Sequence, residues 1–73
     1  MMMRDVILNV EPVELYKLLK FEGLVPSGGI AKMVIDSGEV IVNGETELRK
    51  RRKCFSGDVV EFDGIKLRLV SDH

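Results

Sequence analysis

The basic residues that could bind a ligand gather in one short stretch of this 73-residue chain. Five consecutive positions hold five of its eleven lysines and arginines, although the net charge of the whole chain is −1: Arg49, Lys50, Arg51, Arg52 and Lys53. This separation of charge suits binding of a polyanion better than conversion of a small molecule. A run of charge is often only a solvated loop. This run is so dense, however, that its members repel one another unless a partner neutralises them.

A second candidate site is the segment Ser27-Gly28-Gly29. Ser27 is a good helix N-cap, and two glycines in a first helical turn cost roughly 1 kcal/mol each relative to alanine. A bare backbone lets a phosphate approach the free N–H groups at a helix N-terminus, and Lys32 lies one turn further on. The competing interpretation is a plain N-cap that tolerates its glycines, and the spacing of a P-loop is absent.

Five other residues are weaker candidates for binding. Asn43-Gly44 is first of all a turn signal, because Asn tolerates positive φ, but such a turn also lets a backbone approach closely. Lys17 and Lys20 share one face of the first predicted helix. Tyr16 offers a ring for base stacking, although a tyrosine within a helix is more often a core residue.

The sequence shows little that could catalyse a reaction. His73 is the last residue, and Cys54 has no other histidine to activate it, although Lys53 and Arg52 favour a lower thiol pKa. The carboxylates do not follow the spacing of metal ligands. We therefore expect a protein that is not an enzyme and that uses no metal, cofactor or small-molecule substrate.

Two short helices should position the candidate residues. The first is predicted from about Pro12 to Glu22, because Pro12 suits the first helical position and an apolar stripe follows at helical spacing. The second is predicted from the N-cap Ser27 to Gly38. About four residues connect the helices, which should therefore pack as a helical hairpin.

Alternating patterns predict the strands. A short strand is expected at Val6 to Asn9, and a hairpin should turn at Asn43-Gly44 after residues 40–42. In a second hairpin, Asp63-Gly64 forms the turn, and a two-residue turn determines the register. The expected pairs are Phe62 with Ile65, Glu61 with Lys66, Val60 with Leu67, and Val59 with Arg68. Together these elements predict an α+β fold, with a helical hairpin packed on a mostly antiparallel sheet of about four to five short strands.

Length and composition set further limits. Residues 1–73 are expected to form a single domain, which is too small for a deep active-site pocket. The 45% hydrophobic and 32% charged residues are typical of a soluble globular protein, and a single cysteine allows no intrachain disulfide. No segment approaches the ~20 apolar residues of a membrane span, and the N-terminus does not resemble a signal peptide. We expect a cytoplasmic protein with no membrane partner.

The ordered motifs between Val13 and Phe62 resemble a known family. They are Leu18-Leu19-Lys20, Ser27-Gly28-Gly29, Ala31-Lys32, Val40-x-Val42, Gly44 and the Arg/Lys cluster that leads to Gly57. This order is similar to the RNA-binding domain named after ribosomal small-subunit protein four, the S-four domain, whose helical hairpin on a small sheet is called the αL motif. Within it, the chain is most similar to the small stand-alone bacterial YbcJ-like proteins.

The resemblance implies binding of structured RNA through the face made by the two helices and the first hairpin. It implies that Ser27 and Gly28 begin the second helix at the RNA surface, with Lys32 along that helix and Asn43-Gly44 on the adjoining turn. Two positions depart from the wider family. Gly28 stands where many members have arginine, and Glu11-Pro12-Val13 stands where a basic residue often begins the first helix. Main-chain N–H groups and the basic run would have to replace these phosphate contacts.

The leading hypothesis is a monomeric domain that binds structured RNA, such as ribosomal or transfer RNA, by shape and phosphate contacts. The candidate RNA-binding residues are Lys17, Lys20, Ser27, Gly28, Gly29, Lys32, Asn43, Gly44, Arg49, Lys50, Arg51, Arg52 and Lys53. One alternative is a protein-interaction module whose basic loop docks an acidic partner. Another alternative is binding of double-stranded DNA. It is weaker, because neither helix carries the side chains that read base edges.

Overall fold

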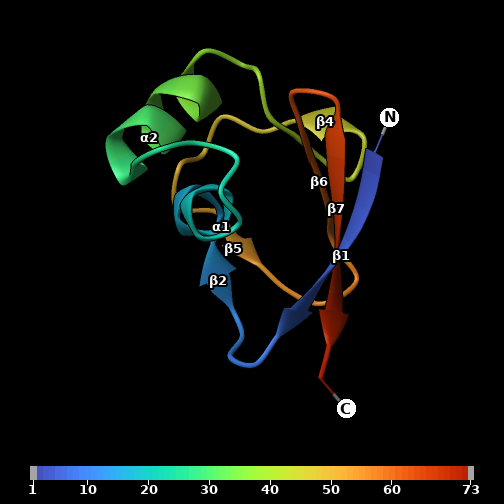
Figure 1. Cartoon of the computed structure of the whole chain (residues 1–73). Coiled ribbons are helices and arrows are strands. Elements are labelled where there is room, and N and C mark those ends of the chain that lie inside the picture. The colour runs from blue at the N-terminus through green and yellow to red at the C-terminus, as the bar shows by residue number, and fades with distance from the viewer. Residues whose placement is uncertain (1, 73) are drawn as a thin grey trace.

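Two helices cover one side of a five-stranded sheet in the computed structural model, which describes residues 2–72, so that His73 lies outside the described residues (Figure 1). In the order β1-β7-β6-β3-β4, the strands are Met2–Leu8, Ile65–Ser71, Val59–Phe62, Ile41–Val42 and Glu45–Thr46. The helices are α1 (Leu15–Phe21) and α2 (Gly28–Asp36). Beside α1, a separate two-stranded sheet pairs β2 (Val13–Glu14) with β5 (Lys53–Cys54). The predicted α+β class is confirmed.

The hairpin of β6 and β7 has the predicted register. Phe62 pairs with Ile65, Glu61 with Lys66, Val60 with Leu67, and Val59 with Arg68. Asp63 and Gly64 have φ angles of 52° and 77°, as a two-residue hairpin turn requires. Turn chemistry and apolar alternation therefore agree on one register.

The first strand is longer than predicted and runs parallel to its neighbour. β1 begins at Met2 rather than Val6, and it runs parallel to β7, from Met2 beside Ile65 to Leu8 beside Ser71. Only Val6 and Leu8 of this strand are buried. Its exposed first half has no apolar alternation that would indicate a strand, and the backbone of β7 holds it in place.

The predicted start of the first helix was wrong. Pro12 does not occupy the first helical position, because Val13 and Glu14 form β2 and pair with β5. The helix begins at Leu15, whose N–H donates to the Arg52 carbonyl at 2.9 Å. The Tyr16 N–H donates to the Lys50 carbonyl at 3.1 Å. Two N–H groups that lack an intrahelical acceptor are thus satisfied by the basic run.

Both helices end at glycine, as predicted. Gly23 has a φ of 74°, and the N–H of Leu24 donates to the Leu19 carbonyl at 3.0 Å, which is the bond of a Schellman motif. Gly38 has a φ of 78° and ends α2 in the same way. The stop at Gly23 leaves only a short connection to Gly28, and α1 and α2 pack against each other as the predicted helical hairpin.

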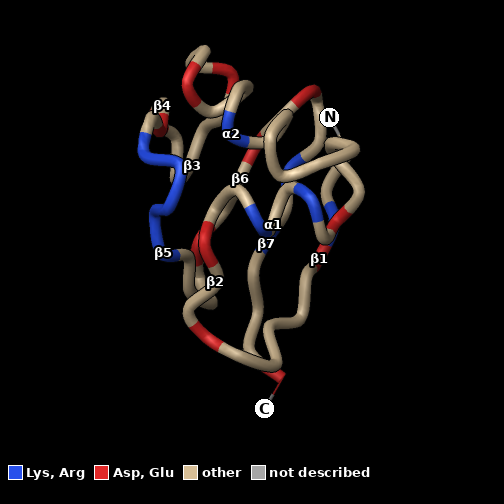
Figure 2. Tube along the Cα trace, turned by 90° about the vertical axis from the view of Figure 1, so that its left-hand side faces the viewer, with Lys and Arg blue, Asp and Glu red and all other residues tan. Residues whose placement is uncertain are grey.

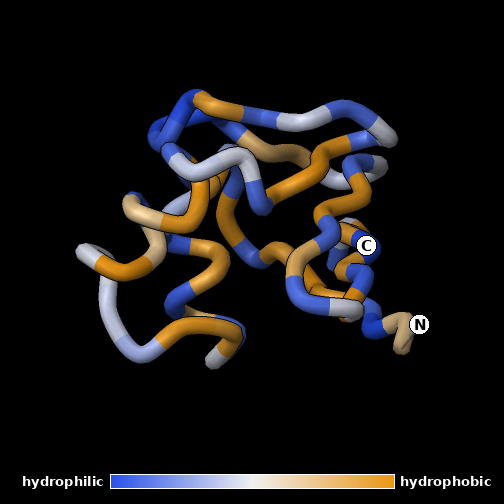
Figure 3. Tube along the Cα trace, turned by 90° about the horizontal axis from the view of Figure 1, so that it is seen from above, coloured by the Kyte–Doolittle hydropathy of each residue, from blue (hydrophilic) through white to orange (hydrophobic). Residues whose placement is uncertain are grey.

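The core lies between the helical hairpin and the sheet. Its most deeply buried side chains are Leu15, Leu19, Ala31, Ile35, Val40, Cys54, Val60, Leu67 and Leu69. Figure 3 shows hydrophobic positions alternating with hydrophilic ones along the strands and recurring in the helices. Between residues 2 and 72, no helix is long and apolar enough to cross a bilayer.

Candidate nucleic-acid interface

The basic run lies against the start of α1. β5 pairs with β2, and the helix N–H groups of Leu15 and Tyr16 bind carbonyls of the run. Figure 2 shows the run as a continuous basic stretch between β4 and β5. These backbone bonds keep the charged segment on the side of the molecule that carries the helices.

Cations from three segments meet at the ring of Tyr16. Lys32 of α2 has its Nζ 4.6 Å from the ring centroid, Arg51 of the basic run has its Cζ at 5.2 Å, and Lys17 has its Nζ at 5.9 Å. A tyrosine ring attracts cations at such distances through its quadrupole. We call Tyr16, Lys17, Lys32 and Arg51 the Tyr16 cluster. The sequence predicted its three cations as binding residues, but not that a tyrosine would gather them.

One carboxylate stands inside the Tyr16 cluster. Glu14 pairs with Lys17 at 3.2 Å and with Arg51 at 3.3 Å. The hydrogen bond from Lys17, followed by that from Arg51, outweighs desolvation and holds the pKa of Glu14 below its ordinary value. Lys17 and Arg51 thus share one ionised carboxylate, and with Lys32 at the same ring the group carries an excess of positive charge.

The start of α2 adjoins this cluster. Ser27 is the predicted N-cap, because its Oγ accepts a hydrogen bond of 3.2 Å from the Ile30 N–H. A Cβ on Gly28 would lie 3.6 Å from Cε2 of Tyr16, which is an ordinary contact, and a Cβ on Gly29 would meet no atom closer than 3.9 Å. Neither glycine has a positive φ. Packing within the protein therefore does not require glycine at these two positions.

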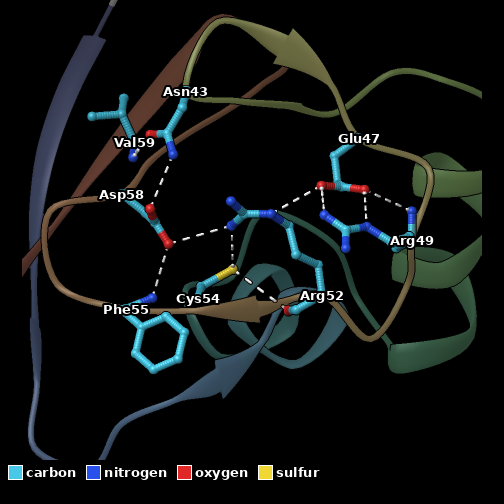
Figure 4. A network of polar contacts seen from close by, with 8 residues as sticks. All are labelled: Asn43, Glu47, Arg49, Arg52, Cys54, Phe55, Asp58 and Val59. Atoms are coloured by element: carbon cyan, nitrogen blue, oxygen red, sulfur yellow. Dashed lines mark hydrogen bonds and ion pairs between the residues drawn. The ribbon is translucent and has the colours of Figure 1, made fainter.

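Arg52 has a different role from its neighbours, because it ties the run to the hairpins (Figure 4). Its Nε lies 2.9 Å from a Glu47 carboxylate oxygen, and its Nη1 lies 3.3 Å from Oδ2 of Asp58. The Arg52 side chain is only 21% exposed. Because its partners enclose it, the main role of Arg52 is structural.

Asn43 belongs to the same network. Its Nδ2 donates to Asp58 at 3.0 Å, and its Oδ1 accepts from the Val59 N–H at 2.8 Å. Burial would raise the pKa of Asp58, but hydrogen bonds from Asn43, the Phe55 N–H and Arg52 outweigh burial and keep that pKa below its ordinary value. The φ angle of Asn43 is 52°, as its place in the predicted turn requires. Gly44, next to it, is exposed.

The remaining cations divide into paired and unpaired ones. Arg49 binds Glu47 at 3.0 Å, and Lys50 lies 3.5 Å from Asp36. Lys20 and Lys53 are exposed, and within the described part of the chain neither has an ion pair. Lys20 lies in the last turn of α1 and does not join the Tyr16 cluster.

An open hollow of about 550 Å³ lies along the basic run. Its walls are Arg49, Arg51, Arg52, Lys53, Phe55 and Asp58, and we call it the basic hollow. Phe55 did not figure among the predicted binding residues. Its signal in the sequence is the position next to the run, since it follows Lys53 with one buried residue between them.

The Cys54 thiol does not behave as its basic neighbours suggested. Burial raises its pKa, although the Arg52 guanidinium acts in the opposite direction. Its Sγ also donates to the Arg52 carbonyl at 3.7 Å. The expectation of a lower thiol pKa is therefore wrong, and Cys54 acts as a core residue. Among residues 2–72, no group of three His, Cys, Asp or Glu side chains has the arrangement of a metal site.

A helical hairpin packed on a small, mostly antiparallel sheet is the fold of an S4 domain. The chain belongs to that family, whose model, described as S4 domain, matches residues 6–70. This is the S-four domain that its motifs resemble.

Individual relatives are similar over most of their length. A protein of Escherichia coli named "Putative RNA-binding protein YbcJ" is 46% identical over 59 residues, which cover 81% of this chain and 84% of that one. "Probable ribosome maturation protein RlbA" of Bacillus subtilis is 38% identical over 63 residues, covering 86% and 89%. The solution structure of YbcJ, described as revealing an αL motif involved in RNA binding, has a TM-score of 0.66 and 40% identity. It covers 96% of this chain and 87% of its own.

Proposed function

We propose that this protein binds structured RNA, without chemistry of its own, through the Tyr16 cluster, the first turn of α2 and the basic run. The observation that carries this proposal is the meeting of Lys17, Lys32 and Arg51 at one ring. They come from three segments of the chain, and a single carboxylate, Glu14, pairs with two of them. Such a concentration of positive charge is best neutralised by a polyanion.

The kind of polyanion is suggested by the relatives. YbcJ is named as an RNA-binding protein, and the name of the Bacillus relative refers to ribosome maturation. We therefore propose ribosomal RNA as the first RNA to test, with transfer RNA as the second. Recognition would be by shape, because an A-form helix hides its base edges in a deep, narrow groove.

The candidate residues divide into those that would contact RNA and those that would hold the basic run in place. Lys17, Lys32, Arg51 and Lys53 would meet phosphates with their side chains, while Gly28 and Gly29 would offer main-chain N–H groups. Arg52 and Asn43 would act mainly by holding the basic run in place, since their polar atoms are engaged within the protein. We further propose that residues 1–73 act as one monomeric domain in the cytoplasm, where structured RNA is abundant.

The test compares single charge changes on the two sides of the molecule. Lys32→Gln removes a cation from the Tyr16 cluster. Lys66→Gln removes one from β7, next to the buried Leu67, and therefore from the sheet face opposite the helices. Binding of a fluorescent ribosomal RNA hairpin is measured by anisotropy at several salt concentrations. We expect Lys32→Gln to weaken binding and Lys66→Gln to leave it nearly unchanged.

A combined variant measures the number of phosphate contacts. Replacing Lys32, Arg51 and Lys53 by Gln should lower the slope of log affinity against log salt concentration by about 2 to 3, since each lost phosphate contact contributes about 0.7–0.9. Unchanged affinity and slope would overturn the proposal. In a pull-down, protein partners that remain after nuclease treatment would point instead to an acidic protein as the partner.

A further inference from the structure

Phe55 is an exposed aromatic side chain in a cationic setting. It lines the basic hollow together with Arg49, Arg51 and Lys53, and 48% of its surface is exposed. The segment alternates around the buried Cys54, so that Lys53 and Phe55 extend to the same side. An aromatic ring is therefore held beside Arg51 and Lys53, two of the side chains proposed to contact phosphates.

The other aromatic residues are not placed in this way. Tyr16 has three cations around its ring, and Phe62 packs against the core. Phe21 is 67% exposed, but it lines a separate apolar groove with Ile7 and other residues. Among the three phenylalanines of the chain, Phe55 alone combines an exposed side chain with a setting of basic residues.

The backbone that carries this ring is fixed. The Phe55 N–H donates to the Asp58 carboxylate at 2.9 Å, and the Phe55 carbonyl accepts from the Asp58 N–H at 3.1 Å. Figure 4 shows Asp58 bound in turn to Arg52 and Asn43, while the ring of Phe55 stays outside this network. A ring on a fixed backbone loses little conformational freedom when a planar group stacks on it.

We propose that the basic hollow receives one unpaired nucleotide of the bound RNA, with its base stacked on Phe55 and its phosphates near Arg51 and Lys53. The inference rests on the proposed function and adds to it a preference for RNA in which a duplex is interrupted by an unpaired base. Stacking on an aromatic ring tolerates any base, because every base has a π-face. The site therefore recognises an unpaired base without reading its identity.

The experiment uses two RNA hairpins that differ only in one bulged nucleotide. Their affinities are measured for the wild type, Phe55→Ala and Phe55→Trp, with Phe21→Ala as the matched control for loss of an exposed phenylalanine. Phe55→Ala should weaken binding of the bulged hairpin by about 5- to 150-fold, the range for loss of one base stack. It should change binding of the paired hairpin by less than about twofold, and Phe21→Ala should affect both as little. Phe55→Trp should retain the preference.

A direct readout distinguishes stacking from a structural effect. In NMR titrations of the wild type with the bulged hairpin, the ring protons of Phe55 should shift upfield, and those of Phe21 should not. Equal weakening of both hairpins by Phe55→Ala, or of neither, overturns the inference while leaving the proposed function intact. Wild-type protein that binds neither hairpin overturns both.

Two other occupants of the hollow are also tested. If adenosine monophosphate binds as tightly as the bulged hairpin, the ligand of the hollow is a free nucleotide. If a glutamate-rich peptide binds the wild type but does not bind Phe55→Ala, the ligand of the hollow is an acidic protein. Either result overturns the inference.

Discussion

Glu14 holds Arg51 in an ion pair of 3.3 Å, although 37 positions separate them in the chain. The carboxylate occupies a place among the cations where a phosphate oxygen would otherwise be attracted. A phosphate that binds Arg51 must therefore compete with Glu14. The acidic residue lowers the affinity of the surface for any polyanion.

The substitution Glu14→Gln should accordingly strengthen RNA binding. Because an exposed ion pair is weak, the affinity should rise only modestly, by up to about fivefold. The free energy of unfolding should fall by a similarly small amount. Anisotropy titrations and urea unfolding of the same preparations measure the two effects, and weaker RNA binding by Glu14→Gln would contradict this role.

Replacing Gly28 and Gly29 by alanine should raise the stability of the protein and weaken its binding of RNA. Alanine fits at both positions, and an alanine in a helix is more stable than glycine by about 0.5–1 kcal/mol. Gly28→Ala/Gly29→Ala should therefore raise the urea midpoint. The same variant should weaken RNA binding, because two methyl groups would keep phosphates from the N–H groups. A variant that is more stable and binds RNA as well as the wild type would exclude close approach at this turn.

Substitutions of Arg52 and of Arg51 should differ in their effects on stability and on RNA binding. Arg52→Gln leaves the mostly buried carboxylates of Glu47 and Asp58 with fewer partners, and should lower the free energy of unfolding by about 1–3 kcal/mol. Arg51→Gln should lower the free energy of unfolding much less, because the pair with Glu14 is exposed, but it should weaken RNA binding. Chemical unfolding of the two variants side by side tests the contrast, which fails if Arg51→Gln proves the less stable protein.

Asp58 should make the free energy of unfolding depend on pH in the acidic range. Its pKa in the folded protein lies below the ordinary value of 3.8, so the unfolded chain takes up this proton first as the pH falls. Its contribution is therefore fully present above pH 3.8 and is lost as the pH falls through the folded pKa. The free energies of unfolding of the wild type and Asp58→Asn should differ by a constant amount near neutral pH. That difference should shrink in acid, and a constant difference down to the acid transition would show that Asp58 is not the responsible group.

Local patterns in the sequence predicted the elements that depend on neighbouring residues. Ser27 was recognised as an N-cap because its hydrogen bond reaches only to Ile30, three residues away. The pairing of Glu61 with Lys66 followed from a two-residue turn at Asp63-Gly64. The cations of the candidate site were found for a similar reason, since a cluster of charge is visible in the sequence itself.

The errors concern segments whose partners are far away in the chain. Pro12 satisfies the local rules for starting a helix, but the pairing of Val13 with Cys54 prevails over them. β1 is parallel to β7 and receives most of its backbone bonds from a strand about sixty residues later. No local pattern could indicate either pairing, because hydrogen bonds between distant backbones carry no signal in side-chain periodicity.

By itself, the sequence determined the two helix stops, the two hairpin turns, the apolar faces and the concentration of charge in one run. Each of these depends on the conformational preferences of a few adjacent residues. The tertiary structure decided that the run lies against α1, that Tyr16 gathers Lys17, Lys32 and Arg51, and that Arg52 is enclosed while Phe55 is exposed. These relations follow from packing between segments that are distant in the chain, and packing decides which side chains of a charged stretch are enclosed and which remain free to bind.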